Sequence, residues 1–258
     1  MSFQTNVNPP YLMDIFKLFF ALCLGLLPYT TLGAQRWQTI APGIEYQDLE
    51  GGILTPWSHI HAFKIDLNYN QLAIVPAKKL EAKNASVDQF AQYSNALISI
   101  NGGFFDQDFN PLGLRISEGA LLNSIKPISW WGVFYIKNNK PYIVSLKRFS
   151  FNKSIDFAIQ SGPRLLVEGK APSLKQGIAD RSALGITADN KVIILVSTNA
   201  AMTTDELAHL LKSPPLYCIN AINLDGGSSS QLYARIKSFQ LNVRGFSNVS
   251  DAIVVKKK

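Results

Sequence analysis

Apolar residues recur along this chain in short runs, often with a period of two, which is typical of half-buried strands. In the clearest run Phe63, Ile65 and Leu67 alternate with the polar residues Lys64 and Asp66. We expect further strands over residues 72–75, 97–100, 131–136, 142–146, 183–187, 192–196, 222–224 and 252–255. Two polar dipeptides separate pairs of these runs and predict hairpin turns: Asn138-Asn139 and Asp189-Asn190.

Two segments carry signals for the start of a helix. Ser86 is followed three residues later by Gln89, and Thr203 by Glu206, which predicts capping boxes for helices over residues 87–93 and 204–211. Pro214-Pro215 ends the second helix. Because strands outnumber helices and do not alternate regularly with them, we predict an α+β fold: a sheet-rich mixed β core with a few packed helices in a single domain.

The N-terminal region differs in composition from the rest of the chain. Residues 15–27 are apolar except for Lys17, and small residues follow up to Ala34. This pattern predicts a signal peptide over residues 1–34, with Met13 as an alternative start, and a mature domain over residues 35–258. The apolar run is shorter than the roughly 20 residues of a spanning helix, although an uncleaved anchor is the alternative. We therefore expect a secreted or periplasmic protein with no stable membrane insertion after signal removal.

Composition narrows the class of protein further. With 47% hydrophobic residues in 258, the chain is not intrinsically disordered. Its net charge is +7, but the basic residues are scattered and not interleaved with aromatic ones, so we expect no nucleic-acid partner. Of the two cysteines, Cys23 lies in the predicted signal peptide, so no internal disulfide is expected in the mature protein.

Three segments share one local pattern, in which an apolar strand ends in glycine and polar residues. They read ISINGGFFD (98–106), FAIQSGPR (157–164) and AINLDGGSSS (221–230). Glycine allows a sharp turn or a close approach to a ligand, and a side chain at a strand end is rigidly placed and accessible. Any one segment is explained by a tight turn, with Asp225 capping the residues after it. Three such segments together indicate a shared site.

Metal-binding patterns are weak in this sequence. His59 and His61 point the same way on a strand, but no third histidine or cysteine has ligand spacing, so we predict surface or packing roles for them. Asp106, Asp108 and Asn110 form a DxDxN pattern that lacks the glutamate of a calcium loop. We therefore assign no metal ligand and no certain cofactor, and a divalent cation stays open.

Six segments, taken in order, resemble the phosphodiester glycosidase family. They are NGGFFD (101–106), PxGLxIxxG (111–119), GVF (132–134), QSGPRLLVEGK (160–170), RSALGIT (181–187) and NLDGGSSSQLY (223–233). The resemblance runs from about Trp57 to Val255, although the segment before the second helix lacks a glycine that many relatives have. It implies a secreted hydrolase that cleaves the glycosidic bond of a sugar-1-phosphodiester, in envelope or exopolysaccharide material. The alternative is a non-catalytic carbohydrate- or phosphate-binding protein linked to polysaccharide export.

The resemblance also implies roles for particular residues. Asp225 is the first candidate for nucleophile, base or stabiliser of the cationic sugar, and Asp106 is the second. Arg181 joins them as a catalytic residue that binds phosphate through paired hydrogen bonds, with a structural ion pair as its alternative. Arg164 is expected to bind phosphate in the same way. The amides of Gly226 and Gly227 are expected to form an anion-binding nest. The full substrate-binding prediction, for a small-molecule or polysaccharide glycosyl phosphodiester, is Asn101, Gly102, Gly103, Ser161, Gly162, Arg164, Gly226, Gly227 and Ser228.

Overall fold

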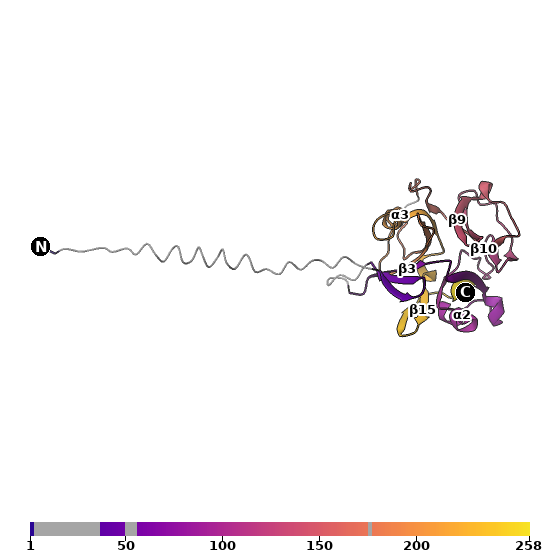
Figure 1. The fold of residues 1–258 in the computed structure, drawn as a ribbon, viewed down its shortest axis with the longest axis horizontal. Coiled ribbons are helices and arrows are strands. Elements are labelled where there is room, and N and C mark those ends of the chain that lie inside the picture. Colours follow the sequence, from indigo (N-terminus) through magenta and orange to yellow (C-terminus); the bar gives the residue numbers. More distant parts are fainter. Residues whose placement is uncertain (3–36, 50–55, 175–176) are drawn as a thin grey trace. The chain divides into compact units, whose positions relative to one another are not determined.

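The computed structural model describes residues 1–2, 37–49, 56–174 and 177–258. Residues Trp37–Lys258 form one compact unit (Figure 1). Apart from its first two residues, the predicted signal peptide lies outside the described residues. Within the described residues, no helix combines the length and the apolar character needed to cross a bilayer.

Three sheets make up the compact unit, and every pairing between the described strands is antiparallel. In spatial order, the seven-stranded sheet contains β1 (Gln38–Ala41), β2 (Ile44–Asp48), β3 (His59–Ile65), β13 (Val192–Thr198), β12 (Ser182–Thr187), β14 (Cys218–Asn223) and β11 (Arg164–Leu166). The second contains β7 (Ala120–Asn123), β6 (Arg115–Ser117), β10 (Ile155–Ser161), β8 (Gly132–Lys137) and β9 (Lys140–Ser145). The third contains β16 (Phe239–Val243), β15 (Leu232–Ile236), β5 (Ile98–Asn101), β17 (Asp251–Lys257) and β4 (Asn70–Pro76).

Both predicted helices are confirmed, and both begin with the predicted capping box. They are α2 (Val87–Ser94) and α3 (Thr204–Lys212). The first packs on β5, β15 and β17 of the third sheet, and the second on β11 and β14 of the seven-stranded sheet (Figure 1). Three short 3₁₀ turns add to these: η1 (Ala77–Leu80), η2 (Leu146–Arg148) and η3 (Gly227–Ser229).

The period-two pattern distributes side chains between two cores. On β3, Phe63 and Ile65 enter the main core, which all three sheets share. Ile60 and Ala62, on the opposite face, join a second cluster with Leu207 of α3. This strand is therefore buried on both faces.

The predicted hairpin turns are confirmed by their backbone angles. Asn138 and Asn139 join β8 to β9 with φ of 49° and 64°, and Asn190 joins β12 to β13 with φ of 62°. Asparagine tolerates this left-handed region better than most residues, which is why it marks such turns. Together these features confirm the sheet-rich α+β class.

Candidate functional site

The three glycine-rich strand ends lie side by side. Asn101, at the end of β5, donates from Nδ2 to the carbonyl of Asp225 at 2.8 Å. In return, the N–H of Asp225 donates to the carbonyl of Gly102 at 3.4 Å. Asn223, at the end of β14, donates from Nδ2 to the carbonyl of Gly162 at 3.2 Å. Segments far apart in the sequence therefore form one continuous group of strand ends.

Asn101 serves this group as a fully buried positioning residue. Its Nδ2 donates to the carbonyls of Gly102 and Asp225. Its Oδ1 accepts from the Ser182 hydroxyl at 2.7 Å and from the Gln231 N–H at 3.3 Å. The side chain is 0% exposed and bonds entirely within the protein. It holds the backbone of Asp225 in place, whereas a direct contact with substrate stays a prediction.

Asp225 is half-buried beside the glycine pair Gly226-Gly227. Its Oδ1 accepts the N–H of Gly226 at 3.0 Å. Burial raises the pKa of this carboxyl, while hydrogen bonds from Ser229 and Gly226 partly oppose the shift. The charge of Asp251 also raises the pKa, and that of Arg115 lowers it. A carboxylate held this way can act on a ligand without first losing a tight ion-pair partner.

The prediction that the amides of Gly226 and Gly227 form an anion-binding nest is wrong, because both N–H groups already have acceptors in the protein. The Gly226 N–H bonds to the Asp225 carboxylate, and the Gly227 N–H donates to the carbonyl of Asp180 at 2.7 Å. Both amides are thus engaged within the protein. What the glycines allow is close packing, since a Cβ at Gly226 would lie 3.0 Å from the carbonyl oxygen of Asp180.

Arg181 lies against the same glycine pair and is 9% exposed. Its Nε donates to the carbonyl of Met202 at 2.8 Å, and its Nη2 donates to the carbonyl of Gly177. Desolvation by burial lowers the pKa of this guanidinium. No carboxylate of the described residues pairs with it, so main-chain carbonyls replace the ion pair considered from sequence. A buried cation of this kind favours an anionic ligand.

Arg164, the second predicted phosphate ligand, starts β11 beside Gly132. A Cβ on Gly132 would lie 2.7 Å from Arg164 Cγ, so glycine leaves room for the arginine stem. Within the described part of the chain its guanidinium makes no hydrogen bond or ion pair. Among the described residues it is therefore a cation without a hydrogen-bond or ion-pair partner.

Asp106, by contrast, is held in the turn after β5. Its Oδ1 accepts the N–H groups of Asp108 and Asn110, each at 2.9 Å, and Asn110 Nδ2 reaches both carboxylate oxygens. The bonds from Asn110 are the main reason that the pKa of Asp106 is lowered. The DxDxN pattern is explained by this turn, and a catalytic role for Asp106 stays a prediction.

A buried ion pair that sequence reasoning missed supports the first glycine pair. Arg115 Nε donates to Asp251 Oδ2 at 2.9 Å, and both side chains are 1% exposed. A Cβ on Gly102 would lie 1.7 Å from Asp251 Oδ1, and one on Gly103 2.8 Å from Arg115 Nη2. Arg115 occupies a variable position of the PxGLxIxxG pattern, and its partner lies 136 residues away, so no local signal marked the pair.

Several buried polar atoms near the strand ends have no hydrogen-bond partner among the described residues. They are Trp131 Nε1, Ser161 Oγ, Asn223 Oδ1, Ser230 Oγ and Asp251 Oδ1. Buried polar groups in folded proteins are nearly always bonded to protein, water or ligand. Ordered water is the partner that such enclosed atoms ordinarily bind. Trp131 also stacks on Phe104, with ring centroids 5.0 Å apart.

A cavity of about 610 Å³ borders the Arg115–Asp251 pair. Asp108 and Asn110 line it, but Asn101, Arg181 and Asp225 do not. This cavity therefore lies beside the turn that holds Asp106, and Asn101, Arg181 and Asp225 lie outside it. Ser228, at the other end of the glycine pair, is exposed.

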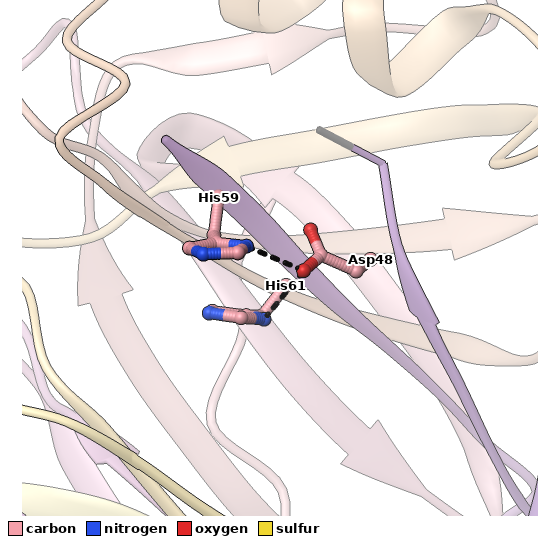
Figure 2. Close-up of side chains that lie close together, drawn as sticks. All are labelled: Asp48, His59 and His61. Carbon is pink, nitrogen blue, oxygen red and sulfur yellow. Dashed lines mark hydrogen bonds and ion pairs between the residues drawn. The ribbon is translucent and has the colours of Figure 1, made fainter. Parts of the chain in front are cut away.

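A second polar cluster lies where β2 ends and β3 begins, and it contains Asp48, His59 and His61 (Figure 2). Asp48 Oδ2 is 2.6 Å from His59 Nδ1 and 3.8 Å from His61 Nδ1. Burial lowers the pKa of His61 to about 4, with Asp48 opposing the shift and His59 adding to it. No third histidine or cysteine has ligand spacing in the sequence, but in the fold Asp48 supplies the third group that could hold a metal with the two histidines.

The fold and the first site define a class: a sheet-rich α+β protein with a carboxylate, arginines and glycine-rich backbone gathered at its strand ends. The sequence model of the phosphodiester glycosidase family matches residues 94–256, more than half of the chain. The chain belongs to this family, which confirms the resemblance found in the sequence.

Several known proteins are similar to this chain in sequence or in fold. The Escherichia coli K12 protein YigE is 33% identical over 115 residues, which are 40% of this chain and 45% of that protein. The catalytic domain of zebrafish N-acetylglucosamine-1-phosphodiester alpha-N-acetylglucosaminidase, auto-inhibited by its pro-peptide, has a TM-score of 0.66 at 19% identity, covering 87% of both chains. A hypothetical protein from Synechocystis has a TM-score of 0.62 at 18% identity, covering 88% of this chain and 64% of that one. At these identities the solved structures show a shared fold.

Proposed function

We propose that this protein hydrolyses the glycosidic bond of a sugar-1-phosphodiester. Water adds to the anomeric carbon, the bond from that carbon to the phosphate oxygen breaks, and a free sugar and a phosphomonoester leave. Membership in the phosphodiester glycosidase family supports this reaction class. The zebrafish relative's name gives an N-acetylglucosamine-1-phosphodiester as its substrate. The observation that carries the proposal is the half-buried Asp225 at the gathered strand ends, where Arg181 packs against the adjacent Gly226 and has no carboxylate partner in the described residues.

Asp225 is the proposed group at the anomeric carbon. Glycosidases pass through a transition state with positive charge on the sugar ring, which a nearby carboxylate stabilises or attacks. A phosphodiester is a good leaving group, so the site needs less general-acid assistance than one that releases a sugar alcohol. Asp106 is the second proposed carboxylate.

Arg181 and Arg164 are the proposed phosphate ligands. A guanidinium binds phosphate oxygens through two parallel N–H bonds. No described residue accepts a hydrogen bond from Arg164, and Arg181 keeps donors beyond those given to Met202 and Gly177. Gly102, Gly103, Ser161, Gly162, Gly226, Gly227 and Ser228 complete the proposed substrate-binding surface.

The direct test is the release of free sugar from a panel of sugar-1-phosphodiesters, including an N-acetylglucosamine derivative. The wild-type protein should release sugar from at least one member, and Asp225→Asn should not. Arg148→Met, in the exposed η2 turn, is the matched surface control and should behave as wild type. Binding of a panel member without any release would instead support a carbohydrate- or phosphate-binding protein.

We also propose that the protein acts outside the cytoplasm, in the periplasm or after secretion, on glycosyl phosphodiesters of envelope or exopolysaccharide material. The support is the apolar N-terminal run followed by small residues. N-terminal sequencing of the exported protein should find a start near Gln35. A start at Met1 or Met13 would contradict cleavage.

A further inference from the structure

The end of β2 and the start of β3 carry a group of ligands that the proposed hydrolysis does not use. Asp48 ends β2 and pairs directly with His61 of β3, while His59 lies two residues earlier on that strand. Directly paired residues, and residues two apart on a strand, share one face of a sheet. Strand pairing alone thus brings the carboxylate and both imidazoles together.

The ligand atoms converge. One atom from each residue lies within 4.8 Å of the other two. The imidazole rings stack with centroids 5.3 Å apart and an interplanar angle of 12°. Figure 2 shows that each ring turns a nitrogen toward the Asp48 carboxylate. Tetrahedral zinc, with bonds of about 2.0–2.1 Å, needs ligand atoms about 3.3 Å apart, so small side-chain rotations bring these atoms into place.

Burial gives the group a rigid base and an open side. His61 is 5% exposed, and its Nδ1, the nitrogen that faces Asp48, lies 2.9 Å from the Tyr46 hydroxyl, a contact that metal binding replaces. The side chains of His59 and Asp48 are 34% and 29% exposed. Zinc sites with three protein ligands leave a further position for water or another ligand, whereas closed structural sites use four. This geometry matches the open type.

We propose that Asp48, His59 and His61 form a binding site for a divalent transition-metal ion, with zinc as its natural occupant. Two imidazoles and one carboxylate suit zinc and its first-row neighbours, whereas calcium and magnesium prefer oxygen ligands throughout. The metal replaces the proton that His59 and Asp48 share in their 2.6 Å contact. The remaining position binds water or an anionic oxygen.

This metal site faces the same side of the sheet as the group of strand ends. His61 pairs with Val196, which pairs with Ser182, and the Ser182 hydroxyl bonds to Asn101. Two strand spacings separate His61 from Ser182, about 10 Å of backbone. The site is therefore distinct from Asp225, and metal binding can be measured without substrate.

The test uses the full chain, freed of metal with a chelator and carrying no polyhistidine tag. Titration with Zn²⁺ in a calorimeter should show one equivalent bound, and Co²⁺ should give the visible absorption of a low-coordinate site. His59→Ala should weaken Zn²⁺ binding about 100-fold or more. Zn²⁺ should raise the melting temperature of the wild type but not that of the variant.

His209→Ala is the matched control. His209 also lies near an aspartate, with Nε2 3.7 Å from Asp205, but it is exposed on α3 and has no second histidine beside it. This variant should bind Zn²⁺ as the wild type does. Because His59 is partly exposed, its substitution should leave the fold intact, which circular dichroism checks. The proposal is overturned if the wild type binds no Zn²⁺, or if His59→Ala binds it equally well.

Discussion

Asp225 is subject to opposing requirements from stability and from the proposed chemistry. Burial raises its pKa, so the ionised carboxylate is less favourable in the folded protein than in the unfolded chain. The folded state thus holds the proton more tightly, and ionisation lowers the free energy of unfolding as the pH rises through the folded pKa. Residues that weaken the fold in this way are frequent at functional sites.

Asp225→Asn should therefore change activity and stability in opposite directions. We expect kcat for sugar release to fall about 10³-fold or more, because the carboxylate at the anomeric carbon is lost. The free energy of unfolding at pH 7 should rise by about 1 kcal/mol, and this gain should shrink at acidic pH, where wild-type Asp225 is protonated. Urea denaturation at several pH values measures the second effect. A variant that loses both activity and stability would indicate a structural role.

The pH dependence of the reaction gives an independent prediction for the same residue. If Asp225 acts as a carboxylate, kcat/KM should fall as the pH drops through its folded pKa, since protonation removes the charge. The midpoint of this acid limb should lie above the ordinary aspartate value of 3.8. A limb centred below 3.8 would instead point to Asp106, whose pKa is lowered by its turn.

Arg164 offers a test of phosphate binding that is largely separate from folding. Because it makes no hydrogen bond or ion pair with the described residues, Arg164→Met should change the free energy of unfolding by less than about 0.5 kcal/mol. The lost charge-assisted bonds should raise KM for the phosphodiester about 10-fold or more. Steady-state kinetics with Arg148→Met as the surface control measure the difference. An unchanged KM would remove Arg164 from the substrate site.

At the scale of elements, the capping box at the start of α3 makes a measurable contribution to the free energy of unfolding. Thr203 Oγ1 accepts the N–H of Glu206 at 3.1 Å, and the Thr203 N–H donates to the Glu206 carboxylate at 2.7 Å. Thr203→Ala should lower the free energy of unfolding by about 1 kcal/mol, as measured by thermal or urea denaturation. An unchanged stability would mean that α3 is held by Leu207 and its neighbours alone.

Elements of this kind could be predicted from the sequence because their signals are local. A capping box spans four residues. The turns at Asn138-Asn139 and Asn190 depend only on whether the asparagine itself tolerates a positive φ. The same reasoning located the strands that end at Asn101, Ser161 and Asn223, although not the strands they pair with. Period-two alternation identifies a strand and its faces, but not its neighbour.

The parts of the sites that sequence reasoning missed depend on those pairings. Asp48 faces His61 only because β2 pairs with β3 in one register, and a shift of one residue would turn the carboxylate to the opposite face. Arg181 donates to the carbonyls of Met202 and Gly177. Every residue has a main-chain carbonyl, so the sequence does not show which residues accept these bonds. The predicted amide nest was wrong for a related reason, since the carbonyl of Asp180 takes up the Gly227 N–H.

At the scale of the whole molecule, whose net charge is +7, the cations of the described residues differ in whether a carboxylate pairs with them. Arg115 pairs with Asp251, Lys191 with Asp66, and Lys64 with Glu45. Arg164 and Arg181 have no carboxylate partner in the described part of the chain, and both lie at the gathered strand ends. These two arginines are the proposed ligands of the phosphate group.

The pair of Arg115 and Asp251 also connects two sheets, since Arg115 begins β6 of the second sheet and Asp251 begins β17 of the third. The other N–H groups of Arg115 donate to main-chain carbonyls, including those of Gln160 and Phe104. Removing one member of a fully buried pair leaves the other charge without compensation, which typically costs about 3–5 kcal/mol. Asp251→Asn should therefore lower the free energy of unfolding by about that amount.

Urea denaturation should separate this effect from that of an ordinary ion pair. Glu45→Gln breaks the partly exposed pair with Lys64 and should cost less than about 1 kcal/mol. Adding Arg115→Met to Asp251→Asn should recover part of the loss, because the uncompensated guanidinium is then absent and the remaining groups are neutral. If Asp251→Asn costs no more than Glu45→Gln, the two sheets are joined by their shared apolar core, and the buried charges serve the neighbouring strand ends instead.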